Sequence, residues 1–387
     1  MPHLTHDQYL ALRRFPALDG MRAVAALLVI VFHFGGPVWR PLSGWIGVQL
    51  FFVLSGFLIT TLALREESRH GRISLRGFYI RRSFRILPVY YVLLGATVML
   101  HALRDDYHLS DLPERMPYLL TVNPDLMIGT AYGHSWTLGI EQKFYLVWPV
   151  LAFGLAGLTW WLRASLAPTA ALLLTVFAVP GYIHYALILA GCQLAIIMHH
   201  PRGFAALRWL TRPVVAVVVG GLFVLVHMAV PRATEFFPSG NTVVMLYGVA
   251  VTFLIPTLLV RTPLSWLLQL RPMVLIGERS YSLYLVQSLA GLAVVSAIPP
   301  LAAHSAETAI VVTVVGLVMA DVLFRWVEQP AIQLGRQVVA HVAPERADKP
   351  ERAVPAAQPY LAPVVPGPRS EAVLPGSRPI SAGTSPS

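Results

Sequence analysis

The sequence is dominated by long apolar segments, each about as long as a helix needs to be to cross a bilayer. Lipid offers the backbone no hydrogen-bonding partner, so each such segment is expected to form a helix. With 56% hydrophobic and 12% charged residues among 387, the chain is predicted to be all-α, a polytopic transmembrane helix bundle of about ten spans. The predicted spans are residues 18–38, 45–64, 86–103, 139–162, 166–181, 182–199, 213–230, 242–260, 278–298 and 307–326.

The basic residues predict how this bundle is oriented. When the segments between spans are assigned to alternating sides, arginine collects on one side, which the positive-inside rule makes cytoplasmic. Both termini are therefore expected in the cytoplasm, and the loop 104–134 outside. The formal net charge of +10 is explained by this orientation, so no nucleic-acid partner is expected. The cytoplasmic arginines are Arg13, Arg14, Arg65, Arg69, Arg72, Arg76, Arg81, Arg82, Arg85, Arg163, Arg202, Arg208, Arg212, Arg261, Arg271 and Arg279, and the opposite side carries Arg40, Arg104, Arg115 and Arg232.

Composition divides the chain into three parts. Residues 1–16 are expected to form a cytoplasmic N-terminal segment, and residues 17–336 the membrane domain. Residues 337–387 are rich in Pro, Ala, Gly and Ser, so they are predicted to form a disordered cytoplasmic tail. The whole is expected to be a multi-pass protein of the cell membrane.

The first span carries two ionisable side chains, Arg22 and His33, with ten residues between them. At 3.6 residues per turn they share one helix face, and they are roughly 16 Å apart along the axis. An ionisable side chain at the centre of a membrane helix costs about 2.5–3.5 kcal/mol on insertion scales, so it usually faces a polar interior and has a function. The alternatives are that His33 is a neutral packing residue and that Arg22 snorkels beside Asp19.

Three arginines, Arg81, Arg82 and Arg85, stand just before the third predicted span. Arg82 and Arg85 are one helical turn apart, and guanidinium groups match phosphate oxygens in a bidentate way. The cluster could therefore hold a polyanion. The alternative is an anchor for anionic lipid headgroups.

Two further spans have polar side chains aligned at helical spacing. Glu141 and Tyr145 share a face of the fourth span, where a carboxylate needs a polar cavity or a structural ion pair. Ser280, Tyr284 and Gln287 share a face of the ninth span, which suits either a polar ligand or hydrogen bonds between helices.

Two charged residues and a proline lie at the end of the last predicted span. Arg325 and Glu328 are one turn apart and are expected to have a structural role, and Pro330 is expected to end the helix.

Several of these stretches together resemble acyltransferase family 3, from about Phe15 to Pro330. The hallmark of that family is an arginine, ten residues and a histidine, as in Arg22 and His33, and an Arg-x-x-Arg element corresponds to Arg82 and Arg85. Two positions depart from the family pattern: Thr137 replaces a serine, and Gln287 stands where a histidine is common. Further matches are the runs Leu18-Asp19-Gly20-Met21-Arg22, Phe51-Phe52-Val53-Leu54-Ser55-Gly56-Phe57, Ser135-Trp136-Thr137-Leu138-Gly139-Ile140-Glu141-Gln142-Lys143-Phe144-Tyr145 and Ser280-Tyr281-Ser282-Leu283-Tyr284-Leu285.

The resemblance implies an integral membrane O-acyltransferase. Such an enzyme would move an acyl group, expected to be acetyl, from cytoplasmic acyl-coenzyme A to a hydroxyl of a carbohydrate, a lipid or a glycosylated metabolite. His33 would be the general base, and Glu141 would orient it or bind the acceptor. Neither a permanently bound cofactor nor a metal is expected. The donor-binding residues would be Arg22, Arg81, Arg82 and Arg85, and the residues lining the path or binding the acceptor would be Ser135, Trp136, Tyr145, Ser280, Tyr284 and Gln287.

The alternative function is a transporter or flippase for a lipid or glycan. The buried histidine and glutamate would then relay protons or bind cargo. A break in the apolar pattern at Pro180-Gly181 would suit the discontinuous helices of such proteins.

The arginine bias gives a direct test of topology. Reporters fused after residue 70 and at the carboxyl end are expected to be cytoplasmic, whereas a reporter at residue 120 is expected outside. Activity of paired reporters, one active only in the cytoplasm and one only outside, measures this. A carboxyl end found outside would contradict the arrangement of about ten spans.

Overall fold

The computed structural model describes residues 4–342, except 155–157, 178, 180 and 304, and these residues contain helices but no strand. Short 3₁₀ turns and connections join the α-helices. The α-helices are α1 (His6–Ala11), α2 (Pro16–Phe34), α3 (Gly47–His70), α4 (Leu75–Leu103), α5 (Leu112–Leu120), α6 (Trp136–Phe153), α7 (Trp160–Val176), α8 (Tyr182–His199), α9 (Pro201–Leu207), α10 (Pro213–Phe236), α11 (Gly240–Thr257), α12 (Pro263–Leu268), α13 (Arg271–Glu278), α14 (Ser280–Ala297), α15 (Ala306–Leu323) and α16 (Gln329–Val342).

Each predicted span coincides with one of these helices, which confirms the prediction of an all-α polytopic bundle. Within the described residues, eight helical stretches are long and apolar enough to cross a membrane. The fourth and fifth predicted spans correspond to α6 and α7, which fall outside those eight. The fourth also ends earlier than predicted, because α6 stops at Phe153 and Gly154 follows it. The orientation of the termini stays a prediction.

Helix α4 begins at Leu75, so the arginine cluster lies inside a helix and not before one. Two local features place this start. Gly71 ends α3 in the left-handed conformation at φ 75°, which costs little without a Cβ. The Ser74 hydroxyl then accepts a hydrogen bond from the Gly77 amide, 3.1 Å away, and caps the new helix. The arginine side chains are thereby carried on the helix that continues through the membrane.

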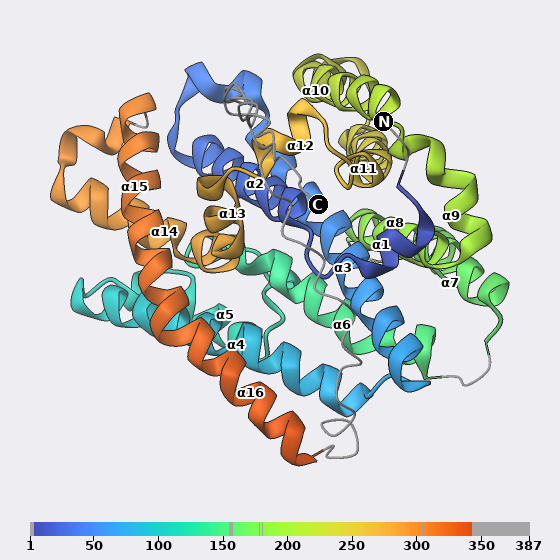
Figure 1. The fold of residues 1–387 in the computed structure, drawn as a ribbon. Coiled ribbons are helices and arrows are strands. Elements are labelled where there is room, and N and C mark those ends of the chain that lie inside the picture. The colour runs from blue at the N-terminus through green and yellow to red at the C-terminus, as the bar shows by residue number, and fades with distance from the viewer. Residues whose placement is uncertain (1–3, 155–157, 178, 180, 304, 343–387) are drawn as a thin grey trace, which may run out of the picture. The chain divides into compact units, whose positions relative to one another are not determined.

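Pro330 does not end the last helix, contrary to the prediction. The residues Phe324–Glu328 form a π-helical turn, and Pro330 then lies in the first turn of α16. The chain is therefore helical on both sides of the proline. Helix α16 runs through the predicted boundary at residue 336 to Val342 and packs along α4 (Figure 1). The predicted tail beyond residue 342 lies outside the described residues.

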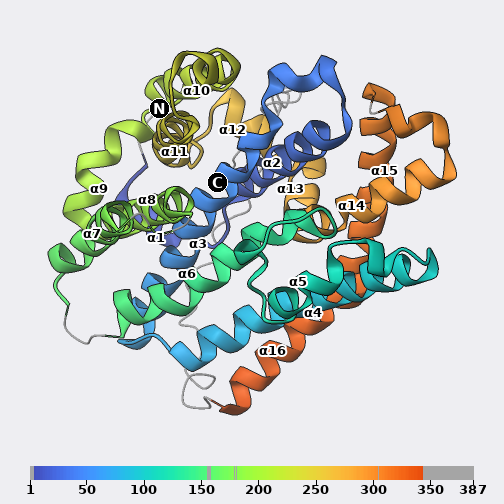
Figure 2. The same ribbon diagram turned by 180° about the vertical axis from the view of Figure 1, so that it is seen from behind.

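The helices that carry the predicted site pack around one another. Helix α2 contacts α3, α13, α14 and α15. Helices α4 and α16 run side by side in both views (Figure 1 and Figure 2), and α14 and α15 form a neighbouring pair. The site residues on α2, α3, α4, α6 and α14 are thus brought into one bundle.

Helices α3 and α8 pack closely, because two glycines let their backbones approach. A Cβ on Gly56 would collide with the carbonyl oxygen of Ile188, and a Cβ on Gly191 would collide with that of Val53. Small residues at a contact between membrane helices allow this close approach.

Replacing Gly56 by alanine is therefore expected to destabilise the protein, by about 1–3 kcal/mol for forced overpacking. Gly95→Ala is the matched control, because nothing lies within 4 Å of a Cβ at that position. Alanine has a higher helix propensity than glycine, and this gain is the same at both positions. Only Gly56→Ala adds a collision, so the melting temperature in detergent should fall for Gly56→Ala and not for Gly95→Ala. Equal melting temperatures would show that the close approach is not required.

Candidate active site

Glu141 on α6 is held by two hydroxyl groups. Ser55 Oγ on α3 donates to Glu141 Oε1 at 2.8 Å, and Tyr145 OH, one turn along α6, donates to Oε2 at 3.0 Å. Trp148 on the same face donates from Nε1 to Thr60 Oγ1 at 2.9 Å and so joins α6 to α3. The helical spacing of Glu141, Tyr145 and Trp148 therefore produces one polar face against α3.

Arg22 on α2 and Arg82 on α4 lie within electrostatic range of this glutamate. Arg22 on α2 lies within electrostatic range of Glu141, Glu328 and Arg85, and its Nη1 is 4.0 Å from Asp19 Oδ1. Each of these charges would be costly alone in lipid, and their grouping lowers that cost. We call Arg22, Arg82, Arg85, Glu141 and Glu328 the charged cluster.

Glu328 is a member that sequence reasoning missed. It is one helical turn from Arg325 in the sequence, and a structural role is expected for both, but Arg325 Nε lies 2.7 Å from Asp321 Oδ2. Glu328 is 1% exposed and accepts a hydrogen bond from Ser282 Oγ at 2.7 Å. The π-helical turn shifts the register of this helix, and no sequence signal indicated that turn.

The three arginines of α4 differ in their partners. Arg81 Nη2 forms an ion pair with Glu66 Oε2 at 2.6 Å. The Arg82 guanidinium lies over the rings of Phe78 and Tyr145, at 5.8 and 5.6 Å from their centroids. Among the described residues, Arg82 and Arg85 form neither a hydrogen bond nor an ion pair at direct-contact distance. Their donors are thus available to a ligand.

His33 lies at the opposite end of α2 from Arg22. Its side chain is exposed, and its ring contacts those of Phe32 and Phe34 at centroid distances of 5.4 and 6.3 Å. The Gln287 side chain of α14 lies next to it. Gln287 is 1% exposed and donates from Nε2 to the Tyr284 carbonyl oxygen at 3.0 Å, while its Oε1 has no hydrogen-bond partner among the described residues.

His134, in the connection before α6, is a second residue that sequence reasoning missed. Its Nε2 is 2.9 Å from the Leu285 carbonyl oxygen, and its Nδ1 is 2.9 Å from Ser288 Oγ. A carbonyl oxygen only accepts, so in the neutral ring Nε2 carries the hydrogen and Nδ1 accepts from Ser288. Burial lowers the pKa of His134 to about 4, so the ring is neutral near pH 7. It also lies within electrostatic range of His33.

The other predicted site residues have mainly structural contacts. Ser135 is fully buried and donates to the Tyr132 carbonyl oxygen at 2.7 Å, and the Trp136 ring packs 4.9 Å from that of His184. Ser280 is fully buried, and its Oγ has no partner among the described residues. Tyr284 OH donates to the His134 carbonyl oxygen at 2.8 Å. Binding roles for these four residues stay predictions.

The structure thus gathers the predicted residues into two groups. Glu141 and Tyr145 belong with Arg22 and the arginines of α4, whereas His33 and Gln287 lie with His134 near the other end of α2. The nearest partners of Glu141 are Ser55, Tyr145, Arg22 and Arg82, and none of these is His33. An orienting role of Glu141 toward His33 stays a prediction. Among the described residues no three His, Cys, Asp or Glu side chains gather into a metal-binding group.

Comparison with known proteins decides the family. The sequence model of acyltransferase family 3, described as an acyltransferase domain, matches residues 15–325. The chain belongs to this family. The match confirms the resemblance drawn from Arg22, His33 and the later motifs, and it covers every site residue predicted from the sequence, whereas Glu328 lies just beyond it.

Curated relatives of this chain include two that are named for O-acetylation of peptidoglycan. The peptidoglycan O-acetyltransferase OatA of Listeria monocytogenes is 29% identical over 307 residues, which cover 70% of this chain and 48% of that protein. The YrhL protein of Bacillus subtilis, provisionally assigned the same activity, is 30% identical over 312 residues, with the same coverage. The chain therefore spans about half the length of these relatives. No solved structure gives a significant match.

The two hydroxyl donors to Glu141 can be tested separately. Ser55→Ala and Tyr145→Phe each remove one donor, and a hydrogen bond to a charged group contributes about 1.5–3 kcal/mol. Each variant is expected to melt at a lower temperature than the parent in detergent. Tyr118→Phe is the control, since its exposed hydroxyl makes no hydrogen bond among the described residues. Parent-like melting of both variants would show that the hydroxyls do not stabilise Glu141.

Proposed function

We propose that this chain is an integral membrane O-acyltransferase that moves an acyl group, expected to be acetyl, from cytoplasmic acyl-coenzyme A to a hydroxyl of a glycan. The observation that carries the proposal is the pair of guanidinium groups on Arg82 and Arg85, which have no direct acid partner among the described residues. Arg85 lies within electrostatic range of both Arg82 and Arg22, and α2 carries both Arg22 and His33.

The donor assignment follows from charge and position. The predicted topology puts the start of α4 at the cytoplasmic side, where coenzyme A would enter. Guanidinium groups that are not already paired can donate hydrogen bonds to phosphate oxygens without first breaking an ion pair. Arg82 and Arg85 are the stronger candidates, and Arg81, which is paired with Glu66, is the weaker. The long pantetheine arm would then extend along α2 toward His33.

The chemical step needs a base for the acceptor hydroxyl. His33 Nε2 or Nδ1 would take the hydroxyl proton while the oxygen attacks the thioester carbonyl carbon. The carbon–sulfur bond breaks as the new carbon–oxygen bond forms, and the imidazolium returns the proton to the departing thiolate. The family position that commonly holds histidine is Gln287 here. An amide cannot exchange this proton, so His33 would act alone.

A glycan is proposed as the acceptor because of the activity for which the curated relatives are named. Two of them are named for O-acetylation of peptidoglycan. These relatives extend well beyond the region shared with this chain, so only the chemical class of the acceptor, a glycan, is proposed for it. Peptidoglycan is the first glycan to test.

Incubating the purified full chain in detergent with labelled acetyl-coenzyme A tests the proposal against the flippase alternative. The acceptor probe is the disaccharide of N-acetylglucosamine and N-acetylmuramic acid. Label transferred to the disaccharide without vesicles or a gradient would support an enzyme. Gradient-dependent movement of unmodified lipid-linked glycan in vesicles, without transfer, would support a flippase and contradict the proposal.

Substitutions at the two ends of α2 should have different kinetic effects. His33→Ala removes the proposed base and is expected to lower kcat by roughly 10²–10⁴-fold with donor KM nearly unchanged. Arg22→Ala is expected mainly to raise the donor KM, because its charge would meet the donor. Glu141→Gln should lower kcat if Glu141 orients His33 and raise the acceptor KM if it binds the acceptor.

The control for this series is His108→Ala, in an exposed turn outside both groups. It should turn over like the parent, and size-exclusion profiles should show that all variants are folded. An inserted His33→Ala protein with a near-parental rate would overturn the assignment of His33 as the base.

A further inference from the structure

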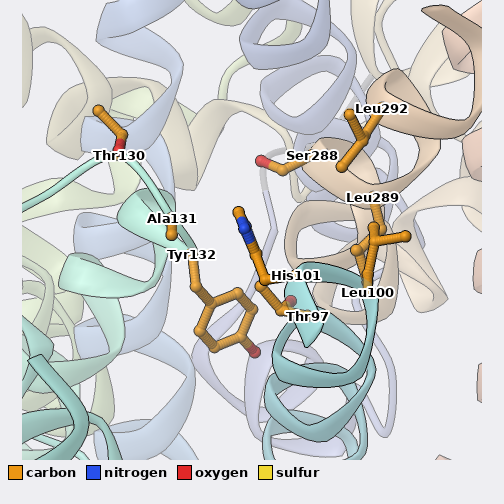
Figure 3. Close-up of a pocket in the computed structure, with 9 residues that line it drawn as sticks. All are labelled: Thr97, Leu100, His101, Thr130, Ala131, Tyr132, Ser288, Leu289 and Leu292. Atoms are coloured by element: carbon orange, nitrogen blue, oxygen red, sulfur yellow. The ribbon is translucent and has the colours of Figure 1, made fainter. Parts of the chain in front are cut away.

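A cavity of about 120 Å³ lies between α4, α14 and the connection before α6 (Figure 3). A single water molecule needs about 10–15 Å³ of cavity volume, so this cavity can hold a group larger than one water. The predicted topology places it toward the outer surface. Its lining residues are Thr97, Leu100, His101, Thr130, Ala131, Tyr132, Ser288, Leu289 and Leu292.

His101 has the geometry of a carboxylate-oriented imidazole. Its Nδ1 is 2.6 Å from Asp106 Oδ1 in the turn after α4. An ionised carboxylate only accepts, so Nδ1 carries a hydrogen, and in the neutral ring Nε2 presents a lone pair. Among the described residues nothing bonds to Nε2, and Figure 3 shows the ring projecting into the cavity between Tyr132 and Ser288.

Ser288 supplies a second acceptor on the facing wall. Its hydroxyl hydrogen is committed to His134 Nδ1, so Ser288 Oγ can accept a hydrogen bond from a molecule in the cavity. Leu100, Leu289 and Leu292 form an apolar side next to these two acceptors (Figure 3). The cavity therefore combines apolar contact with two positions that need a donor.

The remaining wall is rigidly held. Arg115 is 1% exposed, and its guanidinium donates to the carbonyl oxygens of Met127, at 2.8 Å, and Ala131. The amide of Ala131 donates to Asp111 Oδ1 at 3.1 Å. These bonds fix the segment that faces His101. A cavity with fixed walls can select a ligand by shape at a small cost in conformational entropy.

We propose that this cavity binds a sugar ring of the acceptor, with His101 Nε2 and Ser288 Oγ accepting hydrogen bonds from ring hydroxyls and the leucines covering its C–H face. Sugars fit because they combine several hydroxyl donors with an apolar ring face. Ser288 is hydrogen-bonded to His134, and His134 lies within electrostatic range of His33, so the cavity and the proposed base share one neighbour. The inference rests on the proposed function for the chemical class of the ligand.

Equilibrium binding without an acyl donor tests the cavity directly. The full chain in detergent is titrated with the disaccharide of N-acetylglucosamine and N-acetylmuramic acid, followed by microscale thermophoresis. Leu292→Trp, which fills the cavity, and His101→Phe, which keeps a ring but removes the acceptor, are each expected to weaken binding at least about tenfold. Leu103→Trp is the matched control, because Leu103 is 77% exposed on the same helix as His101, and it should bind like the parent.

A milder variant protects the test against misfolding. Asp106→Asn leaves the cavity wall intact, but its amide can donate to Nδ1 and so move the ring hydrogen to Nε2. Binding should weaken several-fold while the melting temperature stays near that of the parent.

Two results would overturn the inference: a parent that does not bind the disaccharide at millimolar concentration, or Leu292→Trp and His101→Phe proteins that bind it as tightly as the parent. Failure of the proposed function would look different. The parent would then bind the disaccharide with the expected variant pattern but transfer no acetyl label to it.

Discussion

The high cost of leaving a charge alone in lipid is the constraint on which this structure depends. Arg22, Arg82 and Glu141 come from three helices, and none could be placed in a bilayer singly without a penalty of a few kcal/mol. Ser55 and Tyr145 donate hydrogen bonds to the carboxylate of Glu141, and the two arginines lie within electrostatic range of it. Together these groups form one polar interior, which lowers the free-energy cost of placing each charge in the membrane. The helices that carry these side chains must therefore pack around them, and the lipid-facing helices pack outside that group.

Helix α2 fixes the distance between the two groups of polar residues. Arg22 lies with the charged cluster, and His33 lies with Gln287 and His134, roughly 16 Å further along a rigid rod. In the proposed reaction this separation keeps the donor phosphates away from the reacting thioester while one helix holds both in register. Positioning of this kind, and not any single residue, accounts for a large part of what an acyltransferase must supply.

Local rules failed where tertiary contacts replaced the expected partners. Pro330 is predicted to end a helix, but a π-helical turn precedes it and the helix continues to Val342. Glu328, at the end of that turn, accepts a hydrogen bond from Ser282. Arg325 pairs with Asp321. The π-helical turn shifts the register of the residues after it, and α16 then packs on α4. Residue spacing along a single helix gives no information about this packing.

The sequence by itself determined the ten helical segments, the family, and the shared face of Arg22 and His33. Hydropathy and helical periodicity are local properties, and lipid leaves the backbone no alternative to a helix. Only the tertiary structure decided that Ser55 binds Glu141, that His134 bonds to Ser288 across 154 positions, and that His101 and Asp106 face a cavity. The first contact joins two helices, and the other two bring a loop residue to a helix. Periodicity within one segment indicates which residues share a face, but it does not indicate which residue of another segment they meet.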